Sequence, residues 1–156
     1  MNGRRLFHVL AVLFAVATYA IAAGPEAFFG RWKQLLEQSG GTIQPRVTSA
    51  GVEIKPAGGN RVSMVMTELT EGGKTNKDEY IFTLDGSPVN DDSGAATGRS
   101  FRQLGPTVWE WANKTSHQET KGHYAVSKDG KMLTITGRRQ RADGAAEYYQ
   151  RVFEKQ

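Results

Sequence analysis

The segment YAVSKDGKMLTIT, residues 124–136, decides the fold class. Asp129-Gly130 lies between Tyr124 to Ser127 and Met132 to Thr136, and Asp-Gly between two such segments is the strongest short-range signal for a β-hairpin. Apolar and polar residues alternate along the second arm, which is the two-residue period of a strand with one buried face. We therefore predict an antiparallel hairpin at this place.

The same alternation recurs along the rest of the chain. Residues 61–69 place three apolar side chains on one face, and residues 107–114 place Trp109 and Trp111 on one face opposite Glu110. Between such segments lie turn-like stretches that contain many of the 18 glycines, and glycine supplies the positive φ angles of tight turns. Many short strands separated by turns predict an all-β sandwich or barrel.

The beginning of the predicted domain carries mixed signals. Phe28, Trp32 and Leu36 fit a helical stripe, but Gly30 interrupts it. We predict a short helical turn over Glu26 to Phe29, followed by a strand from Arg31 to Leu36.

The N-terminal residues predict a cleavable signal peptide. Arg4 and Arg5 precede the unbroken apolar run Val9 to Ala17, and Ala20-Ile21-Ala22 supplies the small-x-small pattern of a signal peptidase site. We expect cleavage after Ala22 or Ala23 and export to the periplasm or out of the cell.

This expectation divides the chain into a signal peptide, residues 1–22, and one domain, residues 23–156. The alternative is a retained membrane anchor, but Val9 to Ala23 is shorter than the roughly 20 apolar residues that a spanning helix needs. We therefore expect no integral membrane span after cleavage.

Composition narrows the function. The chain has no cysteine, which excludes disulfides, metal–thiolate sites and thiol catalysis. Removal of Arg4 and Arg5 lowers the formal net charge from +4 to +2, a weak excess for a nucleic-acid-binding protein. The one dense basic cluster, Arg138-Arg139-Gln140-Arg141, is interpreted as a solvated turn, so we predict no nucleic-acid partner.

Three segments resemble a known group of proteins. Phe29-Gly30-Arg31-Trp32-Lys33 is similar to the Gly-x-Trp opening strand of calycins, the lipocalins and fatty-acid-binding proteins. The central and closing segments look like bacterial exported lipocalin-like domains, in the same order along the chain: Leu84 to Val89, Arg99 to Leu104, Thr107 to Glu110, Val126 to Thr136 and Val152 to Gln156. Two departures from that pattern are the bulky Trp109 and Trp111 and the segment Leu35 to Gln38.

The resemblance implies a small antiparallel up-and-down β-barrel, whose closure removes exposed sheet edges. It also implies a structural role for Trp32, because the matching tryptophan of calycins lies at the closed end of the barrel under a basic side chain from a late strand. We expect Arg151 to be that cover, through a cation–π contact.

Motifs for catalysis or metal binding are absent from the sequence. His117 and His123 would lie about 20 Å apart on one strand, too far to share an ion. The adjacent acids Asp78-Glu79 and Asp91-Asp92 match no hydrolase motif, and the chain contains no nucleophile elbow or phosphate loop. We predict no metal, no cofactor and no enzymatic activity.

Aromatic residues on the predicted strands leave two interpretations open. Side chains fill the interior of many small barrels, and a filled barrel would favour a non-enzymatic protein-interaction module. The alternative is an apolar pocket with Arg102 or Arg151 orienting the ligand. That pocket would be lined by Tyr80, Phe82, Trp109, Trp111 and Tyr149.

We favour a lipocalin-like barrel that binds a small apolar or amphipathic molecule, with the interaction module second and a hydrolase third. Trp109 and Trp111 are expected to face inward together, because their strand carries smaller and charged residues on its other face. The pattern names neither a particular hydrophobic ligand nor an oligomeric state.

Overall fold

The computed structural model describes residues 24–41, 47–89, 98–115, 118–140 and 143–156. The predicted signal peptide lies outside these residues. No helix in the described part of the chain is long and apolar enough to cross a bilayer.

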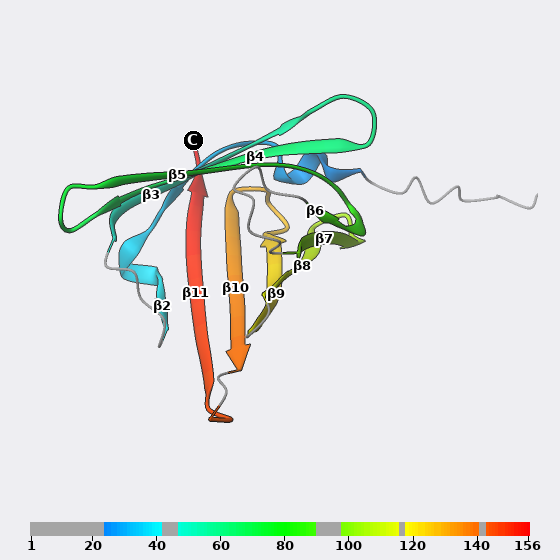
Figure 1. Cartoon of the computed structure of the whole chain (residues 1–156). Coiled ribbons are helices and arrows are strands. Elements are labelled where there is room, and N and C mark those ends of the chain that lie inside the picture. Colours follow the sequence, from blue (N-terminus) through cyan, green and yellow to red (C-terminus); the bar gives the residue numbers. More distant parts are fainter. Residues whose placement is uncertain (1–23, 42–46, 90–97, 116–117, 141–142) are drawn as a thin grey trace, which may run out of the picture.

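Antiparallel strands dominate the described residues (Figure 1). Two 3₁₀ turns, η1 (Pro25–Phe28) and η2 (Leu36–Gln38), precede most of them. The strands are β1 (Gly30–Gln34), β2 (Gly40–Gly41), β3 (Val47–Pro56), β4 (Arg61–Thr70), β5 (Thr75–Thr83), β6 (Asp85–Val89), β7 (Gly98–Gly105), β8 (Val108–Lys114), β9 (Glu119–Val126), β10 (Met132–Gln140) and β11 (Ala146–Lys155).

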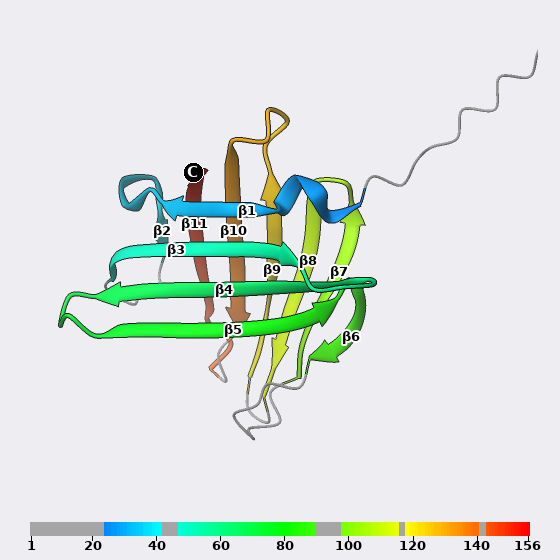
Figure 2. The ribbon, with the colours of Figure 1, turned by 90° about the horizontal axis from the view of Figure 1, so that it is seen from above.

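The strands form one sheet that curls into a nearly closed barrel. Its order is β5-β4-β3-β1-β11-β10-β9-β8-β7-β6, so most neighbours in the sheet are also neighbours in the sequence. Figure 2 shows β1, β3, β4 and β5 running across β7 to β11, with the interior between the two layers. The predicted all-β, up-and-down barrel is confirmed.

The Asp129-Gly130 hairpin is confirmed in detail. β9 and β10 pair antiparallel on either side of the turn, from Leu133 opposite Val126 to Arg139 opposite Thr120. Gly130 has φ +72°, and its N–H donates to the carbonyl of Ser127 at 2.9 Å. The Asp129 carboxylate accepts from the Ser127 hydroxyl at 2.5 Å, which holds the turn in shape.

The opening strand is shorter than predicted. η1 occupies the place of the expected helical turn, but β1 ends at Gln34 and the chain then leaves the sheet through η2. β11 keeps its hydrogen bonds through the excursion: the Leu35 N–H donates to the Val152 carbonyl at 2.8 Å, and the Val152 N–H donates to the Ser39 hydroxyl at 3.0 Å. β2 then resumes the pairing with β11.

The predicted basic turn is also wrong in part. Arg138 to Gln140 belong to β10, and Arg141 lies outside the described residues. Arg139 is half-buried because its guanidinium pairs with Glu147 on the adjacent strand, with Nε 2.6 Å from a carboxylate oxygen. A cross-strand ion pair therefore keeps this cluster in the sheet.

Large aromatic side chains fill the end of the interior next to η1. Phe28 is fully buried, and its ring stacks on Trp109 with the centroids 3.8 Å apart. Phe82 meets Trp109 edge to face and stacks on Phe101 at 3.9 Å. Both Trp109 and Trp111 face inward, as predicted.

The cover over Trp32 differs from the expectation. Its indole N–H donates to the Phe28 carbonyl at 2.9 Å, which ties β1 to η1. The cation over its ring is Lys155, with Nζ 5.0 Å from the ring centroid. Arg151 is wrong as the cover because Trp32 is opposite Lys155 in the register, whereas Arg151 lies four residues earlier on β11.

Candidate ligand-binding site

A row of four residues on adjacent strands forms one inner wall of the barrel, away from the end that η1 covers. Trp111, Gly122, Gly137 and Tyr149 are opposite one another on β8, β9, β10 and β11. The two glycines leave space that the two aromatic rings cover, and the ring centroids lie 6.3 Å apart. The Trp111 indole N–H donates to the Thr136 carbonyl at 2.9 Å, which fixes that ring against β9 and β10.

An internal cavity of about 110 Å³ lies against this wall. Trp32, Phe28 and Trp109 are not among its lining residues, so it is separate from the tightly packed end of the barrel. Both layers of the barrel contribute to it: Met64, Met66, Asp78 and Tyr80 on β4 and β5, and Phe101, Arg99, Trp111, Tyr124, Ile135, Tyr149 and Arg151 on β7 to β11.

Arg99 is the first of two cationic groups on the cavity wall. Its guanidinium carbon lies 4.1 Å from the centroid of the Tyr80 ring, within the range of a cation–π contact. The charges of Arg99 and of the exposed Asp78 act on the Tyr80 hydroxyl in opposite directions: Arg99 lowers its pKa and Asp78 raises it. Arg99 is thus held against β5 from the opposite layer.

Arg151 is the second cationic group. Its Nη1 lies 2.5 Å from the Glu68 carboxylate and 3.4 Å from the Met66 sulfur. Its Nη2 is buried, and among the described residues it has no hydrogen-bond partner. A buried guanidinium nitrogen without an acceptor is costly, so an acceptor from water or a ligand is expected beside it.

The tyrosine hydroxyls around the cavity remain protonated near neutral pH. Burial raises the pKa of Tyr149 to about 12, although the nearby Arg151 and Arg99 act in the opposite direction. Burial likewise raises the pKa values of Tyr124 and Tyr80. These O–H groups are therefore available as neutral hydrogen-bond donors.

The structure brings together some of the predicted ligand-binding residues. Tyr80, Trp111 and Tyr149 line the cavity, and so does Arg151, which was predicted both to orient a ligand and to cover Trp32. Phe82 and Trp109 are buried in the packed end instead.

Arg102 does not lie where a pocket residue was expected. It is exposed on the outer face of β7, and its guanidinium lies close to Gly86. Strand alternation gives the reason: buried Phe101 faces inward, so Arg99 shares its face and Arg102 does not. The same period of two could have identified Arg99 from the sequence.

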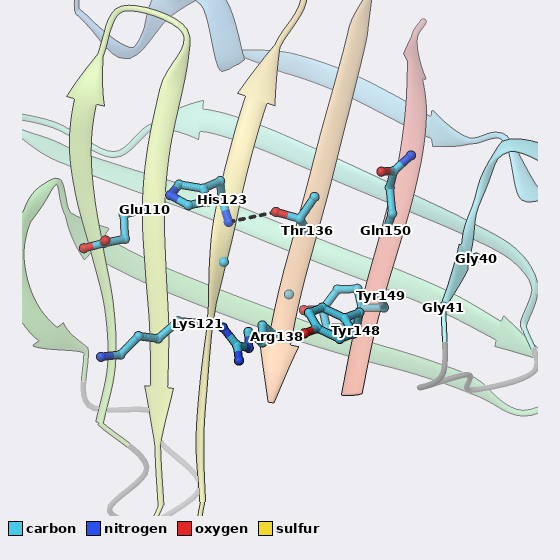
Figure 3. Close-up of a pocket in the computed structure, with 12 residues that line it drawn as sticks. Gly40, Gly41, Glu110, Lys121, His123, Thr136, Arg138, Tyr148, Tyr149 and Gln150 are labelled. Atoms are coloured by element: carbon cyan, nitrogen blue, oxygen red, sulfur yellow. Dashed lines mark hydrogen bonds between the residues drawn. The ribbon is translucent and has the colours of Figure 1, made fainter. Parts of the chain in front are cut away.

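A second, larger hollow of about 670 Å³ lies on the outer face of β8 to β11, beside β2. Figure 3 shows the outward side chains that border it, among them Lys121, His123, Arg138 and Tyr148. His123 is exposed there, and His117 lies outside the described residues. The described residues contain no cluster of three or more histidine or acidic side chains that could hold a metal ion.

Known structures support the fold. No protein-family model matches the chain, and no curated protein sequence is significantly similar to it. Wild-type fluorescent protein UnaG superposes with a TM-score of 0.58 at 13% identity, covering 84% of this chain and 98% of UnaG. A Schistosoma mansoni fatty acid binding protein in complex with arachidonic acid gives 0.56 at 13% identity, covering 85% and 98%.

A redesigned β-barrel is also similar, with a TM-score of 0.53 at 7% identity over 87% of this chain and 97% of the design. Identities this low establish the fold alone. The chain therefore has the same antiparallel β-barrel fold as these proteins.

Proposed function

We propose that this protein is an exported, non-enzymatic binding protein that holds a small amphipathic molecule with an acidic group inside the barrel. The observation that carries the proposal is the cavity itself. There Arg99 lies beside an apolar wall, together with Nη2 of Arg151, which has no hydrogen-bond partner among the described residues. Pockets with an apolar lining and a few convergent polar groups are typical of small-molecule sites. The arachidonic acid complex of the similar barrel is consistent with this class of ligand.

The cavity size limits what enters without rearrangement. A volume of 110 Å³ equals that of about four water molecules at roughly 30 Å³ each, enough for an acidic group or part of a ring. Met64 and Met66 line the cavity, and methionine side chains repack with little cost. We expect these two side chains to move aside for the apolar part of the ligand.

Binding without catalysis fits the state of the acids near the cavity. Glu68 is paired with Arg151, and Asp78 is exposed to solvent. The shielded acid of the two thus has a cationic partner.

The second candidate is a filled barrel that acts as a protein-interaction module. The dense packing around Trp109 and Phe28 favours it, because most of the interior is occupied by side chains. In that case the outer hollow beside Tyr148 would be the contact surface. A binding assay with a charged and a neutral probe separates the two candidates.

We expect 8-anilinonaphthalene-1-sulfonate to bind more tightly than N-phenyl-1-naphthylamine, which has the same rings without the sulfonate. Arg99→Gln should lower the affinity for the sulfonate probe roughly thirtyfold, which is about 2 kcal/mol of binding free energy, because a desolvated ion pair is lost. The affinity of the neutral probe should stay unchanged. Fluorescence titration measures both.

Arg102→Gln is the matched control, because it removes the same charge from the outer face of the same strand. It should leave both affinities unchanged. Equal losses in the Arg99 and Arg102 variants, or no binding of either probe to the folded protein, would favour the filled barrel.

Export remains part of the proposal and rests on the N-terminal sequence. The exported form should begin at Ala23 or Gly24, and Ala22→Phe should block maturation, because the peptidase needs a small residue there. Mass spectrometry of the exported protein checks this, and an exported form that retains Met1 would contradict it.

A further inference from the structure

Glu68 lies directly beside one of the two arginines of the cavity. Its carboxylate is 2.5 Å from Nη1 of Arg151, and the two side chains are only 16% and 14% exposed. Charges this well shielded from solvent are weakly screened by salt and interact more strongly than a surface pair. Glu68 therefore compensates the charge of Arg151 inside the barrel.

Arg99 is compensated differently. Its guanidinium lies over the neutral ring of Tyr80, and the acid that lines the cavity with Tyr80 is Asp78. Asp78 is exposed, so water screens its charge. Among the described residues, two guanidinium groups and the exposed carboxylate of Asp78 line the cavity, and Glu68 pairs with Arg151 from outside the lining. Arg99 is thus the guanidinium without a shielded carboxylate beside it.

We propose that Glu68 is a specificity-determining residue, which restricts the cavity to amphipathic ligands with a single negative charge. This inference rests on the proposed function and names the ligand class more narrowly. The acidic group of the ligand pairs with Arg99 and accepts from Nη2 of Arg151. A second acidic group beside Arg151 would be repelled by the charge of Glu68, which pairs with the same guanidinium.

Glu68 lies next to the cavity wall, because its partner Arg151 is one of the lining residues. Tyr149 lines the cavity, and the pKa of its hydroxyl is raised by the Glu68 charge and lowered by the Arg151 and Arg99 charges. A ligand acid at the same wall experiences the same fields. Removing the Glu68 charge should therefore strengthen anion binding, and a dianion should gain more than a monoanion because each of its charges interacts with Glu68.

The test compares dansyl-glutamine with dansyl-glutamate, which are nearly the same size and differ by one negative charge. The unaltered protein should bind dansyl-glutamine more tightly. In Glu68→Gln, the affinity for dansyl-glutamate should rise at least tenfold more than the affinity for dansyl-glutamine. Glu147→Gln is the matched control: it removes the acid of the other shielded pair, Arg139–Glu147, and should leave the ratio unchanged.

Glu68→Gln leaves Arg151 without its carboxylate and could lower stability. The same comparison is therefore made between Arg151→Gln and the double variant Glu68→Gln/Arg151→Gln, in which no unpaired arginine remains. In the Arg151→Gln background, the loss of the Glu68 charge should again raise the affinity for dansyl-glutamate relative to that for dansyl-glutamine. Agreement of the two comparisons would support Glu68 itself as the cause.

The outcomes separate the two proposals. If the folded protein binds dansyl-glutamine, Arg99→Gln weakens it, and neither Glu68 variant changes the ratio, the role of Glu68 is overturned and the proposed function stands. If neither probe binds the unaltered protein or any folded Glu68 variant, the proposed function is overturned and this inference falls with it.

Discussion

Gly122→Ala should destabilise the barrel by more than about 3 kcal/mol, because the added methyl group has no space. A Cβ at Gly122 would overlap the Thr136 carbonyl oxygen of β10 and lie 2.7 Å from Nε1 of Trp111. The first obstacle is backbone in a central strand, which cannot rotate away. The two strands would have to separate, and the hydrogen bond from the Trp111 indole would be lost with them.

Chemical denaturation followed by far-ultraviolet circular dichroism measures this loss. Gly40→Ala is the control, because a Cβ there meets nothing within 4 Å and its φ is not in the left-handed region. It should change the free energy of unfolding by less than about 0.5 kcal/mol. Equal midpoints for the two variants would contradict the close approach of β9 and β10.

Trp109→Ala should cost about 3–5 kcal/mol, the range for removing a large buried aromatic side chain. Trp109 is fully buried, stacks on Phe28 and meets Phe82 edge to face. Its removal leaves η1 without the ring that holds Phe28 in the end of the barrel. Thermal and denaturant unfolding measure the change.

We also expect Trp109→Ala to leave the affinity for the sulfonate probe unchanged. Trp109 does not line the cavity, so the fraction of Trp109→Ala that remains folded should bind the sulfonate probe as the unaltered protein does. The exposed Leu104, truncated to alanine, is the control for stability and should cost less than about 0.5 kcal/mol. Weaker binding at unchanged stability would mean that the cavity extends to Trp109.

Much of the fold follows from local sequence. Two local features predict the β9–β10 hairpin. The Asp129-Gly130 dipeptide favours a tight turn, and Leu133 and Ile135 alternate with threonines so that one face of the strand is buried. The excursion at η2 was not predicted. It depends on hydrogen bonds to Val152, more than a hundred residues away in the sequence.

The candidate site was predicted less completely, for two reasons. Alternation shows which side chains share a face, but the choice of Arg102 over Arg99 ignored the inward face that Phe101 sets. The Arg151–Glu68 pair joins β11 to β4, and no local pattern brings those two residues together. Cross-strand register decided between Lys155 and Arg151 as the cover of Trp32, and register over that distance is a property of the closed barrel.

The outer hollow is a second place where an acidic probe can bind. Lys121 and Arg138 border it, so an acidic probe could in principle be drawn to the outside of the barrel. A method that reports binding residue by residue separates this surface from the cavity lined by Trp111.

The most direct measurement is a two-dimensional ¹H–¹⁵N spectrum recorded during titration with 8-anilinonaphthalene-1-sulfonate. The chain has three tryptophans, and therefore three indole N–H signals. Trp111 lines the cavity, whereas Trp32 lies under Lys155 at the packed end. We expect the Trp111 signal to shift to saturation while the Trp32 signal stays in place. An unmoved Trp111 signal, with shifts confined to the amides of Lys121 and Arg138, would contradict binding inside the barrel.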